Sequence, residues 1–178
     1  MAGIDQNVDF VPLKLAVMTV SDSRTEETDT SGRLLVERAT AAGHQLVAKI
    51  ITPDEQSVIV SQLREWIADD GIEVVITTGG TGVTGRDVTP EAFDEVCEKM
   101  IPGFGELFRY LSLANIGTST IQSRATAGVA RNTFLFALPG STGACRDGWD
   151  GILAMQLDIR HRPCNFAELL PRLMEDKT

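Results

Sequence analysis

Three apolar runs, each followed at once by small polar residues or glycine, constrain the fold more than any other feature of the sequence. LKLAVMTVS spans residues 13–21, IEVVITT spans residues 72–78 and NTFLFALPG spans residues 132–140. Runs of this kind are typical of strands buried on both faces, as in parallel sheets covered by helices. HQLVAKIIT at residues 44–52 predicts a further strand. The sequence therefore predicts a buried sheet built largely from parallel strands.

Segments with the apolar spacing of amphipathic helices lie between the predicted strands. Residues 31–42 have this spacing and stop at Gly43, which suits a helix C-terminus. Further helices are predicted around residues 59–67, over residues 105–114, and after residue 142, where Trp149, Ile152 and Leu153 face inward. Strands and helices alternate without a linker or repeat, so we expect one α/β domain over residues 13–178. Residues 1–12 are expected to form an unstructured N-terminal arm, and the RPCNF tail to dock on the surface.

The strongest helix start is Thr89-Pro90-Glu91. Thr89 can cap the helix, Pro90 suits the first helical position, and the charge of Glu91 complements the helix dipole. The apolar positions that follow at helical spacing are Phe93, Val96, Cys97 and Met100. We therefore expect an amphipathic helix that reaches Met100.

The composition excludes several classes of protein. A formal net charge of −9 argues against a nucleic-acid-binding surface, and it means that local donors or a cation must meet any anionic ligand. No apolar run approaches the ~18 residues that indicate a membrane span, and no secretory signal is recognisable, so we expect a cytoplasmic protein. Cys97, Cys145 and Cys164 form no CxxC pair or cluster, so neither a zinc site nor a disulfide framework is predicted.

The loops after three predicted strands share a chemistry that suits an anionic ligand. They are TVSDS at residues 19–23, TTGGTG at residues 77–82 and LPGST at residues 138–142. The carboxyl ends of parallel strands line one crevice, and backbone N–H groups in glycine-rich loops bind phosphate. Tight turns alone also favour glycine, serine and threonine, but three such loops together favour a binding site.

Residues 80–85 also match GxGxxG, the fingerprint of dinucleotide-binding proteins. That fingerprint requires the glycines to enter a helix directly, whereas the helix start here comes later, at Thr89-Pro90. We interpret the match as accidental, and a nicotinamide-dependent oxidoreductase would have to bind NAD. No Walker A sequence is present, which argues against ordinary P-loop ATP hydrolysis.

Two aspartates follow consecutive predicted strands, and consecutive strands of a parallel sheet often neighbour each other. Asp54 lies in TPDEQ and Asp87 lies in GRDVTP, so both carboxylates are expected to reach the same crevice. Two carboxylates beside a phosphate-binding loop suit Mg²⁺, which completes its coordination with phosphate oxygens and water. Two alternatives remain open: Asp54 caps the next helix, and Asp87 pairs with Arg86 or braces its loop.

The segments, in their order along the chain, resemble the MoaB/MogA family of molybdenum cofactor biosynthesis, which is also found as the G domain of gephyrin-type proteins. The resemblance covers about residues 13–166. Its motifs are TVSD, PDEQ, TTGGTG, RDVTPEA, PGFGELFR, QSRATAG and LPGS. LPGST departs from the PGxP form of the adenylyltransferase branch, because it has no second proline.

The resemblance implies a three-layer α/β/α fold that assembles as a trimer or a dimer of trimers. It implies binding of molybdopterin and transfer of AMP to its terminal phosphate from Mg²⁺-bound ATP, with release of pyrophosphate. A non-catalytic molybdopterin-binding or assembly protein of the same pathway is the alternative. Asp54 and Asp87 match the catalytic and metal-binding aspartates of the family, and Arg86 is a candidate for stabilising the pyrophosphate. The implied ligand-binding residues are Ser21, Asp22, Thr78, Gly79, Gly80, Thr81, Gly82, Ser123, Pro139, Gly140 and Ser141.

Overall fold

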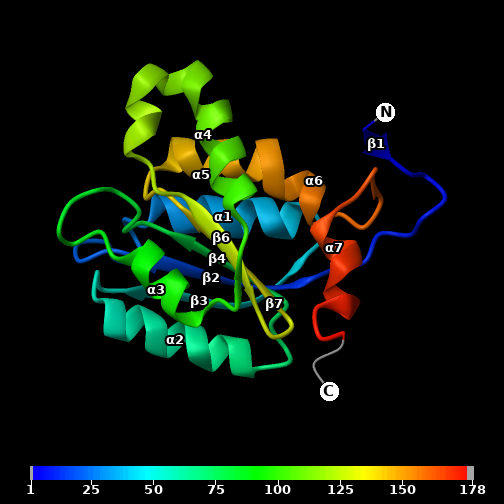
Figure 1. Ribbon diagram of the computed structural model, residues 1–178, viewed down its shortest axis with the longest axis horizontal. Coiled ribbons are helices and arrows are strands. Elements are labelled where there is room, and N and C mark those ends of the chain that lie inside the picture. Colours follow the sequence, from blue (N-terminus) through cyan, green and yellow to red (C-terminus); the bar gives the residue numbers. More distant parts are fainter. Residues whose placement is uncertain (1, 176–178) are drawn as a thin grey trace.

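A six-stranded sheet lies between two layers of helices in the computed structural model, which describes residues 2–175 (Figure 1). The strand order is β3-β2-β4-β7-β6-β5. Neighbouring strands pair in parallel from β3 to β7, and β6 pairs antiparallel with both β7 and β5. The strands are β2 (Lys14–Val20), β3 (Gln45–Thr52), β4 (Val74–Thr78), β5 (Lys99–Met100), β6 (Thr126–Ala130) and β7 (Thr133–Leu138). The prediction of a mostly parallel sheet is confirmed.

Side chains on successive strand residues point to opposite faces, so each strand feeds two apolar cores. Leu15 and Val17 of β2 join one core, and Ala16 and Met18 join the other. The first core is covered by α1 (Thr30–Ala41), α4 (Pro102–Ile116), α5 (Thr142–Gly148), a π-helical turn (Trp149–Leu153) and α6 (Ala154–Gln156). The second core is covered by α2 (Gln56–Ala68) and α3 (Thr89–Val96).

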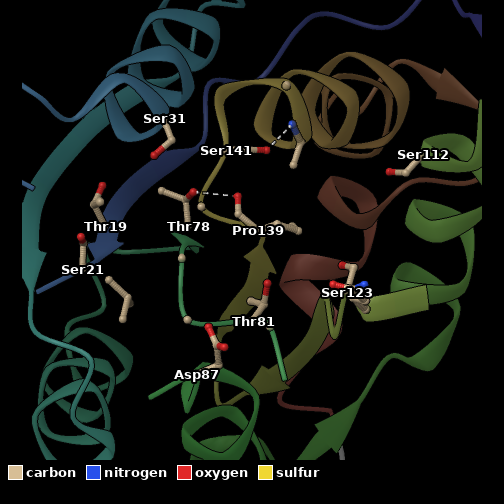
Figure 2. Close-up of a pocket in the computed structure, with 18 of the residues that line it drawn as sticks. Thr19, Ser21, Ser31, Thr78, Thr81, Asp87, Ser112, Ser123, Pro139 and Ser141 are labelled. Carbon is tan, nitrogen blue, oxygen red and sulfur yellow. Dashed lines mark hydrogen bonds between the residues drawn. The ribbon is translucent and has the colours of Figure 1, made fainter. Parts of the chain in front are cut away.

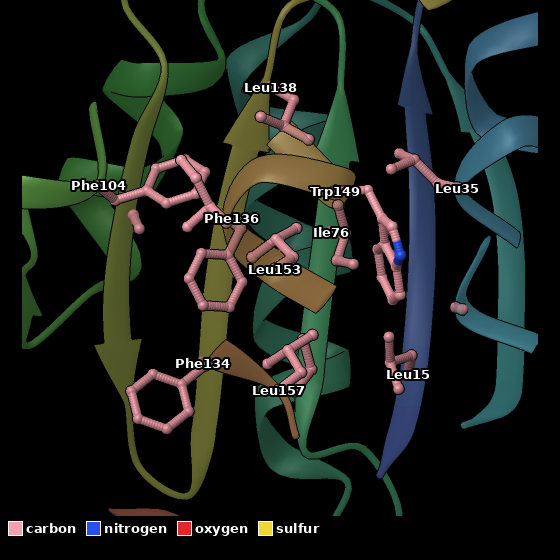
Figure 3. Close-up of a cluster of buried hydrophobic side chains, with 14 of the residues drawn as sticks. Leu15, Leu35, Ile76, Phe104, Phe134, Phe136, Leu138, Trp149, Leu153 and Leu157 are labelled. Atoms are coloured by element: carbon pink, nitrogen blue, oxygen red, sulfur yellow. The ribbon is translucent and has the colours of Figure 1, made fainter. Parts of the chain in front are cut away.

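Aromatic side chains fix α4 against the sheet (Figure 3). Phe104 of α4 packs on Phe136 of β7 with ring centroids 5.2 Å apart, and Trp149 lies in the same core beside β2 and α1. Aromatic residues bury large apolar areas and therefore dominate core energetics. This packing holds α4 in a constant position relative to the carboxyl ends of the strands.

The N-terminal arm is structured, contrary to the expectation for residues 1–12. Within its described part, β1 (Gly3–Ile4) pairs antiparallel with β8 (His161–Arg162). Phe10 also packs on His44, with ring centroids 5.2 Å apart. The RPCNF segment therefore lies beside this arm, and the chain continues into α7 (Phe166–Leu169) and a 3₁₀ turn (Leu170–Arg172).

The third helix differs from its prediction at both ends. Its N-cap is Val88, and the Thr89 hydroxyl donates to the Gly79 carbonyl at 2.9 Å instead of capping. The helix ends at Val96, short of the predicted Met100, because Lys99 and Met100 pair with β6. The sequence analysis predicted no strand at β6, where Ala127, Gly128 and Ala130 are small residues with weak β-propensity. No helix in residues 2–175 has the length and apolar character needed to cross a membrane.

Candidate functional site

A cavity of about 1010 Å³ opens where the carboxyl ends of β2, β4 and β7 meet (Figure 2). These strands are neighbours in the sheet, so the loops that follow them converge, as the sequence predicted. The predicted site residues that line the cavity are Ser21, Asp54, Thr78, Gly79, Gly80, Thr81, Gly82, Asp87, Ser123, Pro139, Gly140 and Ser141. Asp22 and Arg86 are not among the lining residues; they pair with each other.

The end of α4 and the following 3₁₀ helix (Gly117–Gln122) form a wall of the cavity that sequence reasoning missed. Ser112, Asn115, Ser119 and Gln122 contribute polar groups there. Apolar periodicity predicted the helix but carried no information about its polar residues. The reversed direction of β6 also brings its amino end to this edge, which places Ser123 at the cavity.

Glycine is required where the TTGGTG loop passes the end of β2. Gly79 and Gly80 have φ values of 104° and 63°, which disfavour residues with a side chain. A Cβ on Gly79 would lie 2.1 Å from the carbonyl oxygen of Val20, and one on Gly140 would lie 3.1 Å from the Gly79 Cα. The backbones of the three loops therefore pack directly against one another, and only glycine at these positions permits such close contact.

A hydrogen bond between two cavity-lining residues links the end of β4 to the loop after β7. The Thr78 hydroxyl donates to the Pro139 carbonyl at 3.1 Å, and the Cys145 sulfur lies 3.1 Å from the same hydroxyl (Figure 2). Burial raises the pKa of the Cys145 thiol to about 12. The thiol therefore stays protonated near neutral pH, and it has a packing role rather than that of a nucleophile.

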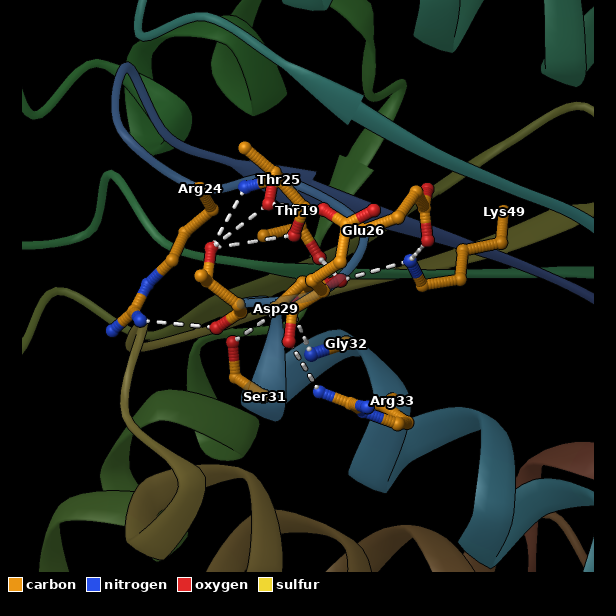
Figure 4. Close-up of polar contacts among 11 residues, drawn as sticks. Thr19, Arg24, Thr25, Glu26, Asp29, Ser31, Gly32, Arg33 and Lys49 are labelled. Atoms are coloured by element: carbon orange, nitrogen blue, oxygen red, sulfur yellow. Dashed lines mark hydrogen bonds and ion pairs between the residues drawn. The ribbon is translucent and has the colours of Figure 1, made fainter.

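A buried carboxylate holds the start of α1 beside the cavity (Figure 4). Asp29 Oδ2 accepts from the Thr19 hydroxyl at 3.0 Å and lies 3.0 Å from Lys49 Nζ. Its Oδ1 accepts from the Gly32 backbone N–H at 2.9 Å, which caps the helix. Burial acts to raise the pKa of Asp29, but Lys49 and these hydrogen bonds lower it. Asp29 therefore stays ionised, and it places Thr19 and Ser31 at the cavity.

Asp54 does not cap the following helix, so that alternative is wrong. The N-cap of α2 is Glu55, without a side-chain hydrogen bond. Asp54 Oδ2 instead accepts from the Asp22 backbone N–H at 3.1 Å, and the Asp54 N–H donates to Asp22 Oδ1 at 3.1 Å. Burial raises the pKa of Asp54, and the negative charges of Asp22 and Asp87 raise it further. A cation beside Asp54 would relieve this repulsion.

Asp87 braces its own loop, which is one of the alternatives left open by the sequence. Its Oδ2 accepts from the Thr84 backbone N–H at 2.8 Å and from the Thr84 hydroxyl at 2.6 Å. Burial acts to raise the pKa of Asp87, but these hydrogen bonds outweigh it and lower the pKa. The other alternative, a pair with Arg86, is wrong, because Arg86 donates to Asp22 Oδ2 at 3.0 and 2.6 Å.

The two aspartates border the same stretch of the glycine-rich loop. A Cβ built on Gly80 would lie 3.1 Å from Asp54 Oδ1, and one built on Gly82 would lie 2.7 Å from Asp87 Oδ2. Within residues 2–175, no group of three or more histidine, cysteine, aspartate or glutamate side chains forms a metal cage. Two carboxylates fit Mg²⁺, which binds through one or two carboxylates and takes its other ligands from phosphate and water.

Two arginines supply positive charge at the cavity. Arg24 lines it and donates to the Thr28 carbonyl at 3.0 Å. Arg146, on α5, also lines it, and its guanidinium forms no ion pair or hydrogen bond with the part of the chain that the structure describes. These are the local donors that an anionic ligand requires in a chain with net charge −9.

Comparisons with known proteins agree with this architecture. The family described as a probable molybdopterin binding domain matches residues 16–158. Molybdenum cofactor biosynthesis protein B of Escherichia coli K12 is 51% identical, over 90% of this chain and 94% of the relative. A crystal structure of a molybdenum cofactor biosynthesis protein B has a TM-score of 0.84 at 36% identity, covering 93% of this chain and 98% of that one.

A second solved structure supports the same conclusion. The molybdopterin biosynthesis enzyme MoaB from Thermus thermophilus has a TM-score of 0.71 at 32% identity, covering 79% of this chain and 89% of that one. The predicted three-layer α/β/α fold is thereby confirmed. Fold, motifs and these similarities lead to one conclusion: the chain belongs to the MoaB/MogA family of molybdopterin-binding proteins.

Proposed function

We propose that the chain acts in molybdenum cofactor biosynthesis, binding molybdopterin in the cavity and adenylating its terminal phosphate with Mg²⁺-bound ATP. The observation that carries this proposal is the position of Asp54 and Asp87 beside one glycine-rich loop. Pockets for one small ligand usually measure about 300–1,000 Å³. The cavity of about 1010 Å³ is large enough to support a site for two substrates.

The reaction joins two phosphates, and it needs positioning and charge neutralisation more than a reactive side chain. An oxygen of the molybdopterin phosphate attacks the α-phosphorus of ATP. The bond from that phosphorus to the bridging oxygen breaks, and pyrophosphate leaves with the electron pair. Asp54 and Asp87 would hold Mg²⁺, which neutralises the negative charge of the phosphates. The protonated Cys145 thiol is consistent with a reaction that has no covalent intermediate.

The chain's own groups supply the orientation. Residues 79–82 lie against the end of β2 and line the cavity. The Gly79 N–H donates to the Leu138 carbonyl and the Gly82 N–H to Asp87, so the N–H groups of Gly80 and Thr81 are the donors that can meet phosphate oxygens. Arg24 and Arg146 add positive charge on the side of the cavity formed by the loop after β2 and by α5. Arg86 is paired with Asp22 and is not among the residues that line the cavity. A contact between Arg86 and pyrophosphate would therefore require this ion pair to break.

The competing function is a non-catalytic molybdopterin-binding or assembly protein of the same pathway. One observation favours it: Asp87 Oδ2 already accepts two hydrogen bonds from Thr84, as a purely structural brace would. In that case, Asp54 and Asp87 would not matter for biological function beyond their effect on stability.

An adenylation assay distinguishes the two functions. Purified protein, molybdopterin, ATP and Mg²⁺ are combined, and both pyrophosphate and the adenylated product are followed. We expect turnover by the wild type and a loss of roughly 100-fold or more in Asp54→Asn and Asp87→Asn, because each change removes a charged metal ligand. Asp94→Asn, an exposed change on α3, is the matched control.

Two results would contradict the proposal. Molybdopterin binding by the wild type without turnover would establish the binding protein in place of the enzyme. Unchanged rates in Asp54→Asn and Asp87→Asn would show that turnover does not depend on these carboxylates. Circular dichroism of each variant separates a loss of activity from a loss of folding.

We also propose that the chain assembles as a trimer or a dimer of trimers. The support is an apolar surface on α4 and the 3₁₀ helix, which we call the α4 apolar surface: Leu107, Tyr110, Leu113, Ile116 and Ile121. Tyr110 is 73% exposed and Ile121 is 80% exposed. Large exposed apolar patches on soluble proteins commonly mark interaction sites.

A further inference from the structure

Arg124 precedes β6 and contacts the glycine-rich loop and the start of α3 at four points. Its backbone N–H donates to the Thr81 carbonyl at 2.9 Å, and its Nε donates to the Gly82 carbonyl at 2.6 Å. Its Nη2 donates to the Asp87 carbonyl at 2.6 Å, and its Nη1 pairs with Glu91. One side chain thus ties together both ends of the loop that carries Asp87.

The rest of the loop has few other anchors. Residues 83–86 are exposed, and the contacts of Thr84 with Asp87 lie within the loop itself. The Arg86–Asp22 pair joins two exposed side chains, and such surface pairs contribute little to stability. Thr89 anchors only the glycine end, through its bonds to the carbonyls of Gly79 and Gly80. Among residues 2–175, Arg124 is the contact that joins the Gly82 and Asp87 ends to the segment before β6.

We propose that Arg124 is a positioning residue that fixes Asp87 in the cavity and thereby sets the affinity of the site for Mg²⁺ bound to a nucleotide. This inference rests on the proposed function, because it takes Asp87 as a metal ligand. Arg124 itself does not line the cavity and acts through the loop. Groups that orient a metal ligand typically change metal affinity by about 10–100-fold when they are removed.

The geometry also explains why arginine is needed. A planar guanidinium donates in several fixed directions at once, whereas a lysine ammonium is a compact charge on a flexible stem. Arg124→Lys therefore keeps the attraction to Glu91 but loses the simultaneous bonds to the carbonyls of Gly82 and Asp87. Glu91→Gln does the reverse, because it removes the ion pair and keeps both carbonyl bonds.

Amide hydrogen exchange on the ligand-free protein tests the positioning directly. We expect the amides of Thr84 and Asp87, which are hydrogen-bonded within the loop, to exchange at least about tenfold faster in Arg124→Ala and Arg124→Lys, and nearly as in the wild type in Glu91→Gln. Added guanidinium ion should restore protection in Arg124→Ala, and methylammonium should not. Arg64→Ala is the control, because it removes another arginine–glutamate pair to α3, with Glu95, away from the cavity.

Titration of Mg²⁺ at fixed ATP tests the consequence, with binding followed by calorimetry and turnover followed in parallel. Arg124→Ala and Arg124→Lys should need roughly 10–100-fold more Mg²⁺ for half-saturation, with kcat at saturating Mg²⁺ within a few-fold of the wild type.

Unchanged exchange in Arg124→Ala would overturn the proposal. So would faster exchange with an unchanged Mg²⁺ requirement. If the wild type binds neither Mg²⁺ nor ATP, the proposed function is wrong, and so is the part of this proposal that concerns Mg²⁺. The exchange comparison would still decide whether Arg124 holds the loop.

Discussion

At the scale of single residues, His44 shows how burial fixes a protonation state. The residue is 5% exposed, and its Nδ1 accepts a hydrogen bond from the Leu13 backbone N–H at 3.2 Å. Its ring lies between Phe10 and Trp149, with centroids 5.2 and 6.2 Å away. Burial lowers the pKa of His44, although the negative charge of Asp158 opposes the shift. The neutral ring is thus the form that the folded protein accommodates.

This shift predicts a loss of stability in acid. The folded-state pKa of His44 lies below the reference value of 6.5, so in this range the unfolded chain binds more protons than the folded protein. The stabilisation is complete above 6.5 and is lost as the pH falls from there through the folded pKa. Denaturant unfolding between about pH 8 and pH 5 should show a smaller pH dependence in His44→Asn than in the wild type. Parallel profiles for the two proteins would rule this explanation out.

The sequence predicted which residues gather at the cavity better than it predicted their partners. The apolar runs locate the strands, and the carboxyl ends of parallel strands share one edge, so Asp54 and Asp87 could be assigned to the same edge of the sheet. Their strands, β3 and β4, are not neighbours as expected, because β2 lies between them. Their hydrogen bonds come from the Asp22 backbone and from Thr84, and these depend on loop conformations that no spacing rule encodes. The same limit applies to Asp29, which is hidden in an unremarkable TDTSG segment.

At the scale of elements, α4 approaches the segment before β6 through a glycine. A Cβ on Gly105 would lie 2.3 Å from the Ala125 carbonyl oxygen, whereas one on Gly103 of the same helix would meet open space. The contact fixes how closely α4, a wall of the cavity, sits against the sheet. Helix periodicity in the sequence identifies such a helix but not the residue at which it touches its neighbour.

The two glycines give a matched pair of variants. Gly105→Ala should lower the free energy of unfolding by about 1–3 kcal/mol, as overpacking against backbone typically does. Gly103→Ala should cause no loss, because alanine is the better helix former and nothing obstructs its methyl group. Urea unfolding of both variants gives the comparison. Equal midpoints would show that α4 can move away from Ala125 without a penalty.

Strand prediction failed where strands are short. The parallel strands β2, β4 and β7 carry continuous large apolar residues, whereas β5 has only Lys99 and Met100. The pairing of β5 with β6 depends on tertiary contacts, which the local sequence pattern does not contain. The apolar spacing therefore predicted that α3 continues to Met100, whereas Lys99 and Met100 belong to the sheet. The N-terminal arm was missed for the same reason: β1 is two residues long and its partner, β8, lies at the other end of the chain.

At the scale of the whole molecule, the proposed trimer or hexamer gives a prediction about mass and salt. Light scattering should give three or six times the 19.3 kDa of one chain. Copies with a net charge of −9 repel one another, and salt screens that repulsion, so assembly should strengthen as ionic strength rises. Ile121→Glu, on the α4 apolar surface, should weaken assembly, and Val58→Glu, an exposed apolar position on α2, should not. A monomer at micromolar concentration would contradict the proposal.

The hairpin between β6 and β7 has a consequence for how the cavity tolerates insertions. Its turn, Arg131-Asn132, lies at the opposite end of these strands from the cavity, and the pairing runs from Ala130↔Thr133 to Thr126↔Ala137. A one-residue slip in this pairing would turn every side chain of β6 to the other face of the sheet. It would also shift Ser123 and Arg124 along the cavity rim by about 3.3 Å, the rise of one strand residue. The register set by a distant surface turn therefore determines where Ser123 lies at the cavity.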